Sequence, residues 1–511
     1  MAALYSSLHQ ATTKEALDQS ALRRTKTIED MRTYMTRLEL SISPTIHIIH
    51  ITGTKGKGST ASLCESILRF AYKQRTGLFT SPHLVDIRER IRVNGKPISE
   101  DVFGEVYWEI RRRLEDCHVE LNADDDPPTL PGYFRMLTLM ALFCFQHYEP
   151  GLDVIILEVG MGGRYDATNV IDIPGRLVAC GVTLLDLDHT RVLGSTLEEI
   201  AKEKGGIFQQ LKGKKNPGQG KDQGESRKQF FAIDTNEESV LSVLRECAEQ
   251  EGWGVLTTVS NADVLSADTP LGLSGPHQRI NAELAIALCQ SVMRDTTSTD
   301  LLHYALKSTS WPGRCQSICL GRHLTIHLDG AHTPLSLAAC LTWYQSISMN
   351  SGTEQVLLFN CSHERNPVPL LQQLTTIPFQ RVYLCKADFE RPSGVGKPQA
   401  NELLADAGIG IEAQHDDGLE DGTPTWQETM ATIWNVLCEG APPSTTGLSV
   451  QEAISQVIQA SDATSIHMLV CGSLYIVGSV LEALEWKEKS ADGKVKFNNA
   501  RRLSKERPLV N

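Results

Sequence analysis

The amino-acid sequence predicts an α/β protein with two domains, each built around a mainly parallel sheet. Three observations carry this prediction. The chain has 511 residues, whereas a single hydrophobic core stops growing at roughly 250–300 residues. Short, continuously apolar strands alternate with helical segments, a pattern typical of sheets covered on both faces. The alternation stops near residue 310 and then restarts, so we expect domains over residues 1–310 and 311–490.

Composition and charge exclude several classes of protein. The hydrophobic fraction of 41% and the charged fraction of 22% exclude a disordered, collagen-like or coiled-coil chain. The 49 Lys and Arg against 62 Asp and Glu give a net charge of −13, which argues against a nucleic-acid partner. No apolar run approaches the roughly 18 residues of a membrane span. No apolar heptad pattern stands out either, which favours a monomer.

Cysteine usage and the N-terminal segment bear on the compartment. The thirteen cysteines form no C-x-x-C pair, and their number is odd. This favours a reducing compartment over a disulfide framework. The first 24 residues contain Glu15 and Asp18 and lack the acid-poor, Arg-rich composition of a transit peptide. We therefore expect a cytoplasmic protein and leave a mitochondrial pool open.

In the first domain, three predicted strands end at polar turns. Residues 45–51 lead into a glycine-rich turn and a helix, 153–159 lead into Gly160-Met-Gly-Gly163, and 177–183 lead into Asp186-Leu-Asp-His189. The carboxyl ends of such strands are where α/β proteins place their sites.

The second, smaller domain repeats the alternation, and three further stretches look like additions. Trp311-Pro-Gly-Arg314 is interpreted as the linker or its edge. Residues 211–229 and 414–448 contain little to bury and are expected to be mobile loops. Residues 491–511 form a basic tail, interpreted as solvated or as an anion-binding or localisation signal. The expected strands are 323–329, 356–360, 381–385 and 467–471, and the expected helices are 337–343, 370–374 and 474–484.

The sequence Thr52-Gly-Thr-Lys-Gly-Lys-Gly-Ser-Thr60 lies between a strand and a helix. Its glycines let backbone N–H groups approach phosphate oxygens, the helix N-terminus adds a positive dipole end, and Lys57 can reach terminal phosphates. The loop departs from G-x-x-x-x-G-K-[ST] because Gly58 separates Lys57 from Ser59. A tight turn with surface lysines is the alternative. We predict a nucleoside triphosphate as the ligand.

Glu158 and His189 are candidate metal ligands. Glu158 ends an otherwise apolar strand, where a carboxylate must be paired, protonated or bound to a metal. His189 follows two aspartates and, taken alone, is as readily a loop residue as a ligand. Beside a phosphate loop both fit Mg²⁺, which takes few protein ligands at phosphoryl-transfer sites. Lys204, by contrast, is interpreted from the sequence as a solvated helix residue.

Two further groups are ambiguous on their own. Arg88, Arg90 and Arg92 alternate along an expected extended segment, so they form either a cationic face for a carboxylate-rich ligand or a simple polar strand face. In the second domain, Asp329 and His332 follow a strand. The aspartate there can hold ribose hydroxyls, orient an amine or cap the next helix.

Taken together, these motifs resemble one family, the folylpolyglutamate synthases of eukaryotic type, which are relatives of the Mur peptide ligases. The matches follow the family's order over nearly the whole chain. The matching strings are TGTKGKGST (52–60), GLFTSPHLVDIRERIRVNGKPIS (77–99), LEVGMGGRYDATN (157–169), LDHTRVLGSTLEEIAKEKGGIF (187–208), GPHQRINAELA (275–285), WPGR (311–314), LDGAHTP (328–334) and CGSLYIVGSV (471–480).

The resemblance implies an ATP-dependent amide ligase. It would add L-glutamate to the γ-carboxylate of a tetrahydrofolate or folylpoly-γ-glutamate through an acyl phosphate, releasing ADP and phosphate. The implied fold is an N-terminal P-loop, Mur-ligase-like ATPase domain that binds ATP and folate, followed by a C-terminal Rossmann-like domain that binds glutamate. The implied cofactors are ATP and Mg²⁺, and a monovalent cation such as K⁺ is compatible with them.

The resemblance also implies the roles of individual residues. The phosphate loop comprises Gly53, Gly56, Lys57, Gly58, Ser59 and Thr60, and further ATP contacts come from Asn281, Arg314 and Asp329. The implied catalytic group comprises Lys57, Lys204, Arg314 and His332, the last of these near the γ-phosphate. The implied metal positions are Ser81, Glu158, His189 and a carbamylated Lys204. The implied folate-binding residues are Ser81, Pro82, His83, Arg88 and Arg90.

Two departures and two alternative functions remain. Asp186 stands where the family usually has a small residue, and the insertion at 211–229 replaces the customary stretch, which leaves room for an altered substrate range or a weakened paralogue. One alternative is a dihydrofolate synthase, which attaches the first glutamate to dihydropteroate, or an enzyme that performs both steps. The other is a non-catalytic nucleotide-binding switch, supported by Cys385-Lys-Ala-Asp388, a distant echo of the guanine-reading N-K-x-D.

Overall fold

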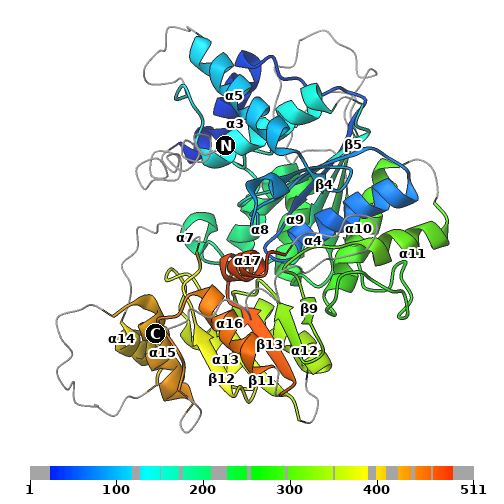
Figure 1. Cartoon of the computed structure of the whole chain (residues 1–511). Coiled ribbons are helices and arrows are strands. Elements are labelled where there is room, and N and C mark those ends of the chain that lie inside the picture. Colours follow the sequence, from blue (N-terminus) through cyan, green and yellow to red (C-terminus); the bar gives the residue numbers. More distant parts are fainter. Residues whose placement is uncertain are drawn as a thin grey trace, which may run out of the picture. The chain divides into compact units, whose positions relative to one another are not determined.

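The computed structural model forms two compact units (Figure 1). Unit 1 comprises the described residues of Met1–Leu273 and His277–Ser310, and unit 2 comprises those of Ser274–Pro276 and Trp311–Asn511. The structure describes residues 23–117, 127–149, 151–171, 177–208, 227–249, 255–293, 297–348, 352–388, 399–409, 424–438, 443–461 and 464–486.

Unit 1 is built on one mainly parallel sheet. Within the described ranges the sheet has eight strands in the order β4-β3-β2-β5-β1-β6-β7-β8. The strands from β2 to β8 in this order are parallel, whereas β3 and β4 extend one edge antiparallel. The bounds are β1 (His47–Thr52), β2 (Thr76–Phe79), β3 (Ile91–Val93), β4 (Lys96–Pro97), β5 (Val154–Glu158), β6 (Leu177–Val182), β7 (Arg227–Ile233) and β8 (Leu256–Val259).

Helices cover both faces of this sheet, because its central strands are apolar on both sides. Ile48 and Ile49, neighbours in β1 that face opposite sides, are both fully buried. One face is covered by α4 (Lys57–Ser66), which continues into η2 (Ile67–Ala71), and by α10 (Gln278–Val292), with α11 (Thr299–Ser308) packed on α4 and η2. The other is covered by α3 (Thr27–Arg37), α5 (Glu100–Asp116), α6 (Tyr133–Phe143), α8 (Leu197–Gly205) and α9 (Glu238–Glu249). Short helical segments are η1 (Arg24–Lys26), η3 (Ile87–Arg90), η4 (Cys144–Tyr148), α7 (Thr190–Leu193) and η5 (Gly206–Phe208).

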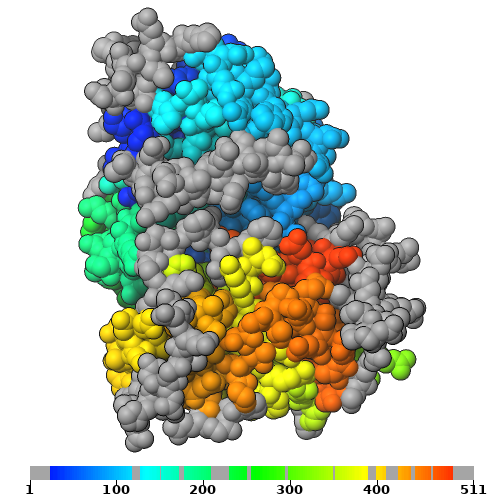
Figure 2. Space-filling model, turned by 60° about the vertical axis from the view of Figure 1, so that its left-hand side comes forward, coloured from blue at the N-terminus to red at the C-terminus, as the bar shows by residue number. Residues whose placement is uncertain are grey.

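Unit 2 has a smaller sheet of five strands among its described residues, in the order β12-β11-β13-β10-β9, with only the edge strand β9 antiparallel. The helices α16 and α17 pack against each other, and Figure 2 shows the surface of this region in orange and red. The strands are β9 (Gln316–Leu320), β10 (Leu324–Leu328), β11 (Glu354–Phe359), β12 (Arg381–Leu384) and β13 (Ile466–Cys471). The helices are α12 (Pro334–Ser348), α13 (Val368–Leu374), α14 (Ala400–Asp406), α15 (Trp426–Leu437), α16 (Val450–Ala460) and α17 (Leu474–Ala483).

Two of the expected loop regions contain regular structure. Residues 227–229, assigned from the sequence to an insertion, begin strand β7. Helix α15 lies inside 414–448 and buries Trp426, Met430 and Trp434 against the core of unit 2. The sparse apolar residues of that region are spaced for one helix face, which its acidic composition concealed. Residues 211–226 and the tail 491–511 lie outside the described residues.

The described part of the chain contains no helix long and apolar enough to cross a membrane. All thirteen cysteines are free thiols, and most of them are buried.

A hydrogen-bonded pair of histidines in unit 2, of which His327 is buried, predicts acid sensitivity. His327 is 2% exposed, and its Nε2 lies 2.8 Å from Nδ1 of His467. Burial, together with His467, lowers the pKa of His327 from its ordinary 6.5 to about 3. Between these values the unfolded chain binds the extra proton, so stability falls as pH falls below the unfolded pKa.

We expect His327 alone to cost unit 2 about 2 kcal/mol of unfolding free energy between neutral pH and about pH 5. Urea unfolding can be followed by the fluorescence of Trp343, whose ring lies 5.7 Å from the His327 ring. His327→Gln should show a correspondingly smaller loss over the same pH range. An equal loss in both proteins would contradict the prediction.

Candidate functional site

The predicted phosphate loop connects β1 to α4 and is held in a conformation that only glycine adopts without strain. Gly53 has φ +144° and Gly56 has φ +92°. A Cβ atom on Gly53 would lie 1.8 Å from the hydroxyl oxygen of Thr183 on the neighbouring chain segment. The N–H groups of Thr54 and Lys55 donate to the Leu184 carbonyl at 2.9 and 3.0 Å. The loop is therefore pre-formed, and α4 begins at its end, as an anion site requires.

Asn281 of α10 packs directly against this loop. A Cβ atom on Gly56 would lie 2.4 Å from the Asn281 Oδ1, and the Asn281 amide nitrogen donates to the Gln278 Oε1 at 3.0 Å. Thr60, at the first turn of α4, is fully buried, and no described residue hydrogen-bonds to its hydroxyl. The structure thus brings together Asn281 and the glycine-rich loop, which lie more than 200 residues apart in the chain.

Lys204 is not the solvated helix residue that the sequence alone suggests. It is 4% exposed, and its Nζ donates to the Gly53 carbonyl at 2.7 Å. Burial, with the cations of Lys57 and Lys55 nearby, holds its pKa well below the usual value. Helix periodicity places Lys204 on the buried face of α8 beside Ile200 and Ala201, a signal that its charge outweighed in the sequence interpretation.

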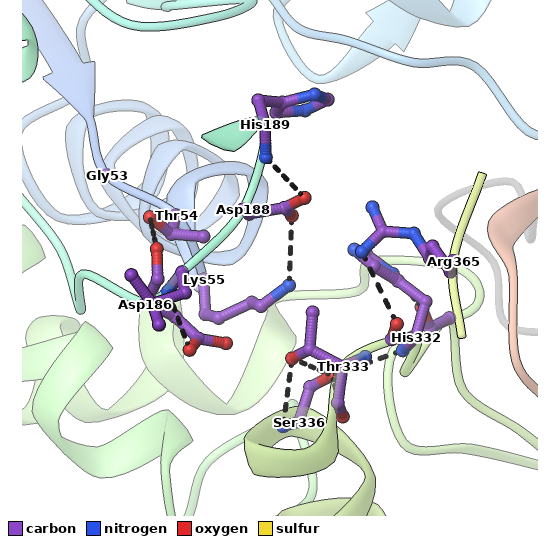
Figure 3. Close-up of polar contacts among 12 residues, drawn as sticks. Gly53, Thr54, Lys55, Asp186, Asp188, His189, His332, Thr333, Ser336 and Arg365 are labelled. Atoms are coloured by element: carbon purple, nitrogen blue, oxygen red, sulfur yellow. Dashed lines mark hydrogen bonds and ion pairs between the residues drawn. The ribbon is translucent and has the colours of Figure 1, made fainter. Parts of the chain in front are cut away.

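The loop after β6 is tied to the phosphate loop by an ion pair. Lys55 Nζ lies 3.3 Å from Asp188 Oδ2, and Asp188 Oδ1 accepts the His189 N–H at 3.0 Å (Figure 3). His189 has φ +53°, a left-handed conformation that is uncommon outside glycine. Asp186, the departure from the family pattern, accepts the Thr54 hydroxyl through its backbone carbonyl at 3.2 Å. Sequence interpretation gave no role to Lys55 or Asp188.

Because Lys55 and Asp188 form this ion pair, we expect the removal of either one to weaken nucleotide and Mg²⁺ binding to a similar extent. Asp188→Asn keeps an acceptor for the His189 N–H but removes the charge that faces Lys55. We therefore expect the dissociation constant for the nucleotide and the Mg²⁺ concentration needed for binding to rise together, by about tenfold each. Lys55→Met should give a similar change, and the double variant should be no worse than the poorer single variant. Isothermal titration with ADP, with and without Mg²⁺, measures both. Additive effects would show that the two residues act separately.

Glu158 and Ser81 meet at the carboxyl ends of β5 and β2. Glu158 is 4% exposed, and its Oε2 accepts the Ser81 backbone N–H at 2.9 Å. The turn that follows Glu158 is fixed by the buried Asp166, whose Oδ2 accepts the N–H groups of Gly160 and Met161 at 3.1 Å each. Burial raises the pKa of Asp166. Nothing in the sequence distinguished Asp166 from an ordinary loop aspartate, because its role in fixing this turn is seen only from its contacts with the backbone.

The donor set at these strand ends fits Mg²⁺ better than a metal that needs a full protein cage. Among the described residues, no three His, Cys, Asp or Glu side chains gather closely enough to hold a metal ion. The Glu158 carboxylate and the Ser81 hydroxyl are hard oxygen donors, the type that Mg²⁺ prefers, and Mg²⁺ usually completes its shell with water and phosphate oxygens.

The expectation of a cationic strand face at Arg88, Arg90 and Arg92 is wrong. Residues 87–90 form the η3 turn, so these arginines do not alternate along one strand. Arg88 pairs with Asp86. Arg90 is 2% exposed and donates to the His83 Nδ1 at 2.9 Å. The capping box of Asp86 and Glu89 starts this turn. The sequence interpretation, which assumed alternating residues on an extended segment, did not consider this capping box.

The segment before η3 is organised by Glu89. Its carboxylate accepts the backbone N–H groups of Leu84, Val85 and Asp86 at 2.8–3.0 Å. The peptide bond between Ser81 and Pro82 is cis. The predicted folate-binding residues Ser81, Pro82 and His83 therefore lie on one self-contained loop next to Glu158.

In unit 2, the residues predicted to bind the nucleotide lie on two adjoining turns at the end of the sheet. Asp329 is 8% exposed and accepts the backbone N–H groups of Cys315 and Ala331 at 2.8 Å each. His332 Nδ1 lies 2.7 Å from the Gly330 carbonyl. Because a carbonyl can only accept, Nδ1 carries a proton and donates it to Gly330. Figure 3 shows Arg365 beside His332, with Nη1 3.5 Å from the His332 carbonyl.

Comparison with known proteins shows to which family the chain belongs. The chain is 33% identical over 538 residues to the mitochondrial folylpolyglutamate synthase of Bos taurus, covering 90% of this chain and 87% of the relative. It is 32% identical over 479 residues to the folylpolyglutamate synthase of Saccharomyces cerevisiae strain FostersO, covering 90% and 81%. The chain belongs to the folylpolyglutamate synthase family. No protein-family model matches it.

Solved structures of this family share the fold. The Mycobacterium tuberculosis folylpolyglutamate synthase complexed with ADP and AMPPCP has a TM-score of 0.68 and 23% identity, covering 90% of this chain and 96% of that chain. Escherichia coli FolC in complex with DHPP and ADP has a TM-score of 0.63 and 23% identity, covering 90% and 92%. The α/β fold class and the family resemblance predicted from the sequence are confirmed.

Proposed function

We propose that this member of the folylpolyglutamate synthase family is an ATP-dependent ligase that adds L-glutamate to the γ-carboxylate of reduced folates and folylpolyglutamates. The observation that carries the proposal is the arrangement in unit 1. A pre-formed phosphate loop ends in α4, a buried lysine is bonded to that loop, and Glu158 meets the Ser81 loop two strands from β6. The relatives named folylpolyglutamate synthase support the substrate class.

Phosphate binding is assigned to the loop and α4. The backbone N–H groups of Gly53, Gly56, Lys57 and Gly58, together with Ser59 and Thr60, are proposed to surround the phosphates, and Lys57 supplies a cation. Asn281, Arg314 and Asp329 are proposed to contribute the remaining ATP contacts. Ser81, Glu158, His189 and a carbamylated Lys204 would hold Mg²⁺, which would neutralise charge on the phosphate oxygens. A monovalent cation such as K⁺ is proposed as an additional activator.

The chemistry requires two displacements. A folate γ-carboxylate oxygen attacks the γ-phosphorus of ATP, and the bond to the bridging oxygen breaks, which releases ADP and leaves an acyl phosphate. The amine of L-glutamate then attacks the acyl carbon, and the tetrahedral intermediate expels phosphate as the amine loses a proton. Lys57 and Arg314 are proposed to stabilise negative charge on the transferred group, and His332 is proposed to hold a proton nearby.

Folate recognition is assigned to the loop of Ser81, Pro82 and His83 with Arg88 and Arg90. Because Arg90 is buried against His83, we propose that it orients this histidine, and that the more accessible Arg88 meets substrate carboxylates. Glutamate is proposed to bind through unit 2. We propose a monomer in the cytoplasm with a mitochondrial pool, in keeping with the mitochondrial relatives.

Mass spectrometry of reaction products tests the proposal. The purified chain is incubated with Mg-ATP, L-glutamate and either tetrahydrofolate or dihydropteroate. We expect successive glutamyl additions to tetrahydrofolate, with ATP hydrolysis that depends on both folate and glutamate. Addition only to dihydropteroate would make the protein a dihydrofolate synthase, addition to both would make it bifunctional, and addition to neither would refute the ligase and favour the nucleotide switch.

A further inference from the structure

Two turns of unit 2 are joined by one buried carboxylate. The first turn comprises residues 311–315, directly before β9, and carries Arg314. The second comprises residues 329–333 and follows β10. Asp329 lies at the start of the second turn, is 8% exposed, and reaches across to the first.

Asp329 accepts three hydrogen bonds. Its Oδ2 accepts the Cys315 backbone N–H at 2.8 Å and the Cys315 thiol at 3.4 Å, while its Oδ1 accepts the Ala331 N–H at 2.8 Å. A carboxylate has about four lone-pair directions, so most of its capacity is used inside unit 2. The Gly330 N–H also donates to the Gly313 carbonyl at 3.2 Å, which fastens the two turns at a second point.

The first turn is held in a conformation that needs such support. Cys315 has φ +44°, a left-handed value that is strained for a non-glycine residue. Its neighbour Arg314 lies against the second turn, because a Cβ atom on Gly330 would be 2.5 Å from Arg314 Nη1. The bond from Cys315 to Asp329 therefore sets the direction in which the preceding Arg314 side chain leaves the turn.

We propose that Asp329 and Cys315 are positioning residues that hold the guanidinium of Arg314 in place for phosphoryl transfer. The inference rests on the proposed function in one respect, namely that Arg314 stabilises charge on the transferred phosphoryl group. It gives Asp329 a role different from the direct ATP contact that the family resemblance implies. It also gives a role to Cys315, whose thiol donates to the same oxygen as its backbone N–H.

Steady-state kinetics of Asp329→Asn distinguish the positioning of Arg314 from a direct contact with ATP. An amide can present only one acceptor oxygen, so either the Cys315 or the Ala331 N–H loses its partner. If Asp329 positions Arg314, we expect kcat to fall by about 30- to 100-fold while the KM for ATP changes less than about threefold. The ratio of kcat/KM for ATP to that for 2′-deoxy-ATP should remain that of the wild type. A raised KM for ATP with loss of this discrimination would overturn the proposal and restore a direct ribose contact.

Variants at Cys315 and Arg314 test the connection itself. Cys315→Ser retains a side-chain donor and should keep kcat within about threefold of the wild type, whereas Cys315→Ala should lower it by about five- to tenfold. Cys361→Ala removes another buried thiol of unit 2 and serves as the matched control. Arg314→Lys combined with Asp329→Asn should be no slower than the slower single variant. Fully multiplicative losses would show that Asp329 does not act through Arg314.

Hydrogen exchange of the ligand-free protein provides a readout that does not depend on ligase activity. In Asp329→Asn we expect faster exchange at peptides that contain Cys315 and Ala331, with unchanged exchange over β11 and β13. If the wild type shows no ligation to any folate, the proposed function fails whatever the exchange result. If the wild type is active and the variant keeps a normal kcat, this inference fails by itself.

Discussion

Lys204→Met is expected to remove most of the ligase activity while leaving the fold intact or more stable. The side chain is buried, and its amine is hydrogen-bonded to the Gly53 carbonyl. A buried ammonium group is costly to the folded state even with the carboxylates of Asp188 and Asp166 nearby, so we expect an apolar chain of similar volume to keep or raise stability. The same substitution removes the group that fixes the phosphate loop and, if carbamylated, a metal ligand.

We expect kcat to fall by about 1,000-fold for Lys204→Met, with an unchanged or higher unfolding midpoint. Lys202→Met, which alters an exposed lysine on the same helix, is the matched control and should leave kcat within about twofold. Intact mass measured at neutral pH in bicarbonate reports whether Lys204 carries a carbamate. Near-normal turnover in Lys204→Met would remove this lysine from the proposed site.

Glu158→Gln is the second substitution for which a large effect is expected. The amide keeps one oxygen for the Ser81 N–H, so the loop contact can survive, but the negative charge that faces the proposed metal is lost. We expect the Mg²⁺ concentration for half-maximal rate to rise by at least about tenfold, and kcat to fall by about 100-fold.

Titration of the rate with Mg²⁺ at saturating ATP and folate measures both quantities. Glu65→Gln is a close control, because Glu65 is also 4% exposed and lies in unit 1, but it bonds to Arg69 and Thr76 instead of Ser81. Glu65→Gln should lower stability without altering the Mg²⁺ dependence. A Glu158→Gln enzyme with the wild-type Mg²⁺ requirement would exclude this carboxylate as a ligand.

The local sequence pattern correctly predicted those strands and turns whose structure depends only on residues close together in the chain. The apolar run before Thr52 forms β1, and the glycines after it form the phosphate loop because positive φ values need glycine at Gly53 and Gly56. The strand ending at Glu158 and its alignment with β1 follow in the same way, since parallel strands place their carboxyl ends together. These motifs also identified the family.

The sequence interpretation failed where particular side-chain contacts decide the local structure. The arginines at 88, 90 and 92 were expected to share one strand face, but the capping box of Asp86 and Glu89 folds them into a turn. Helix α15 lies in a region whose composition suggested only a loop. In both cases a few hydrogen bonds or buried aromatic rings outweigh the average character of the segment.

By itself, the sequence determined the fold class, the phosphate loop and the family, because these depend on residue order and on conformations that few residues allow. Only the tertiary structure decided which polar groups are buried and what they hold. Lys204 is bonded to Gly53, Lys55 to Asp188, and Asp329 to Cys315. The physical reason is that a polar group removed from water must find a partner, and the fold brings that partner from a distant part of the chain.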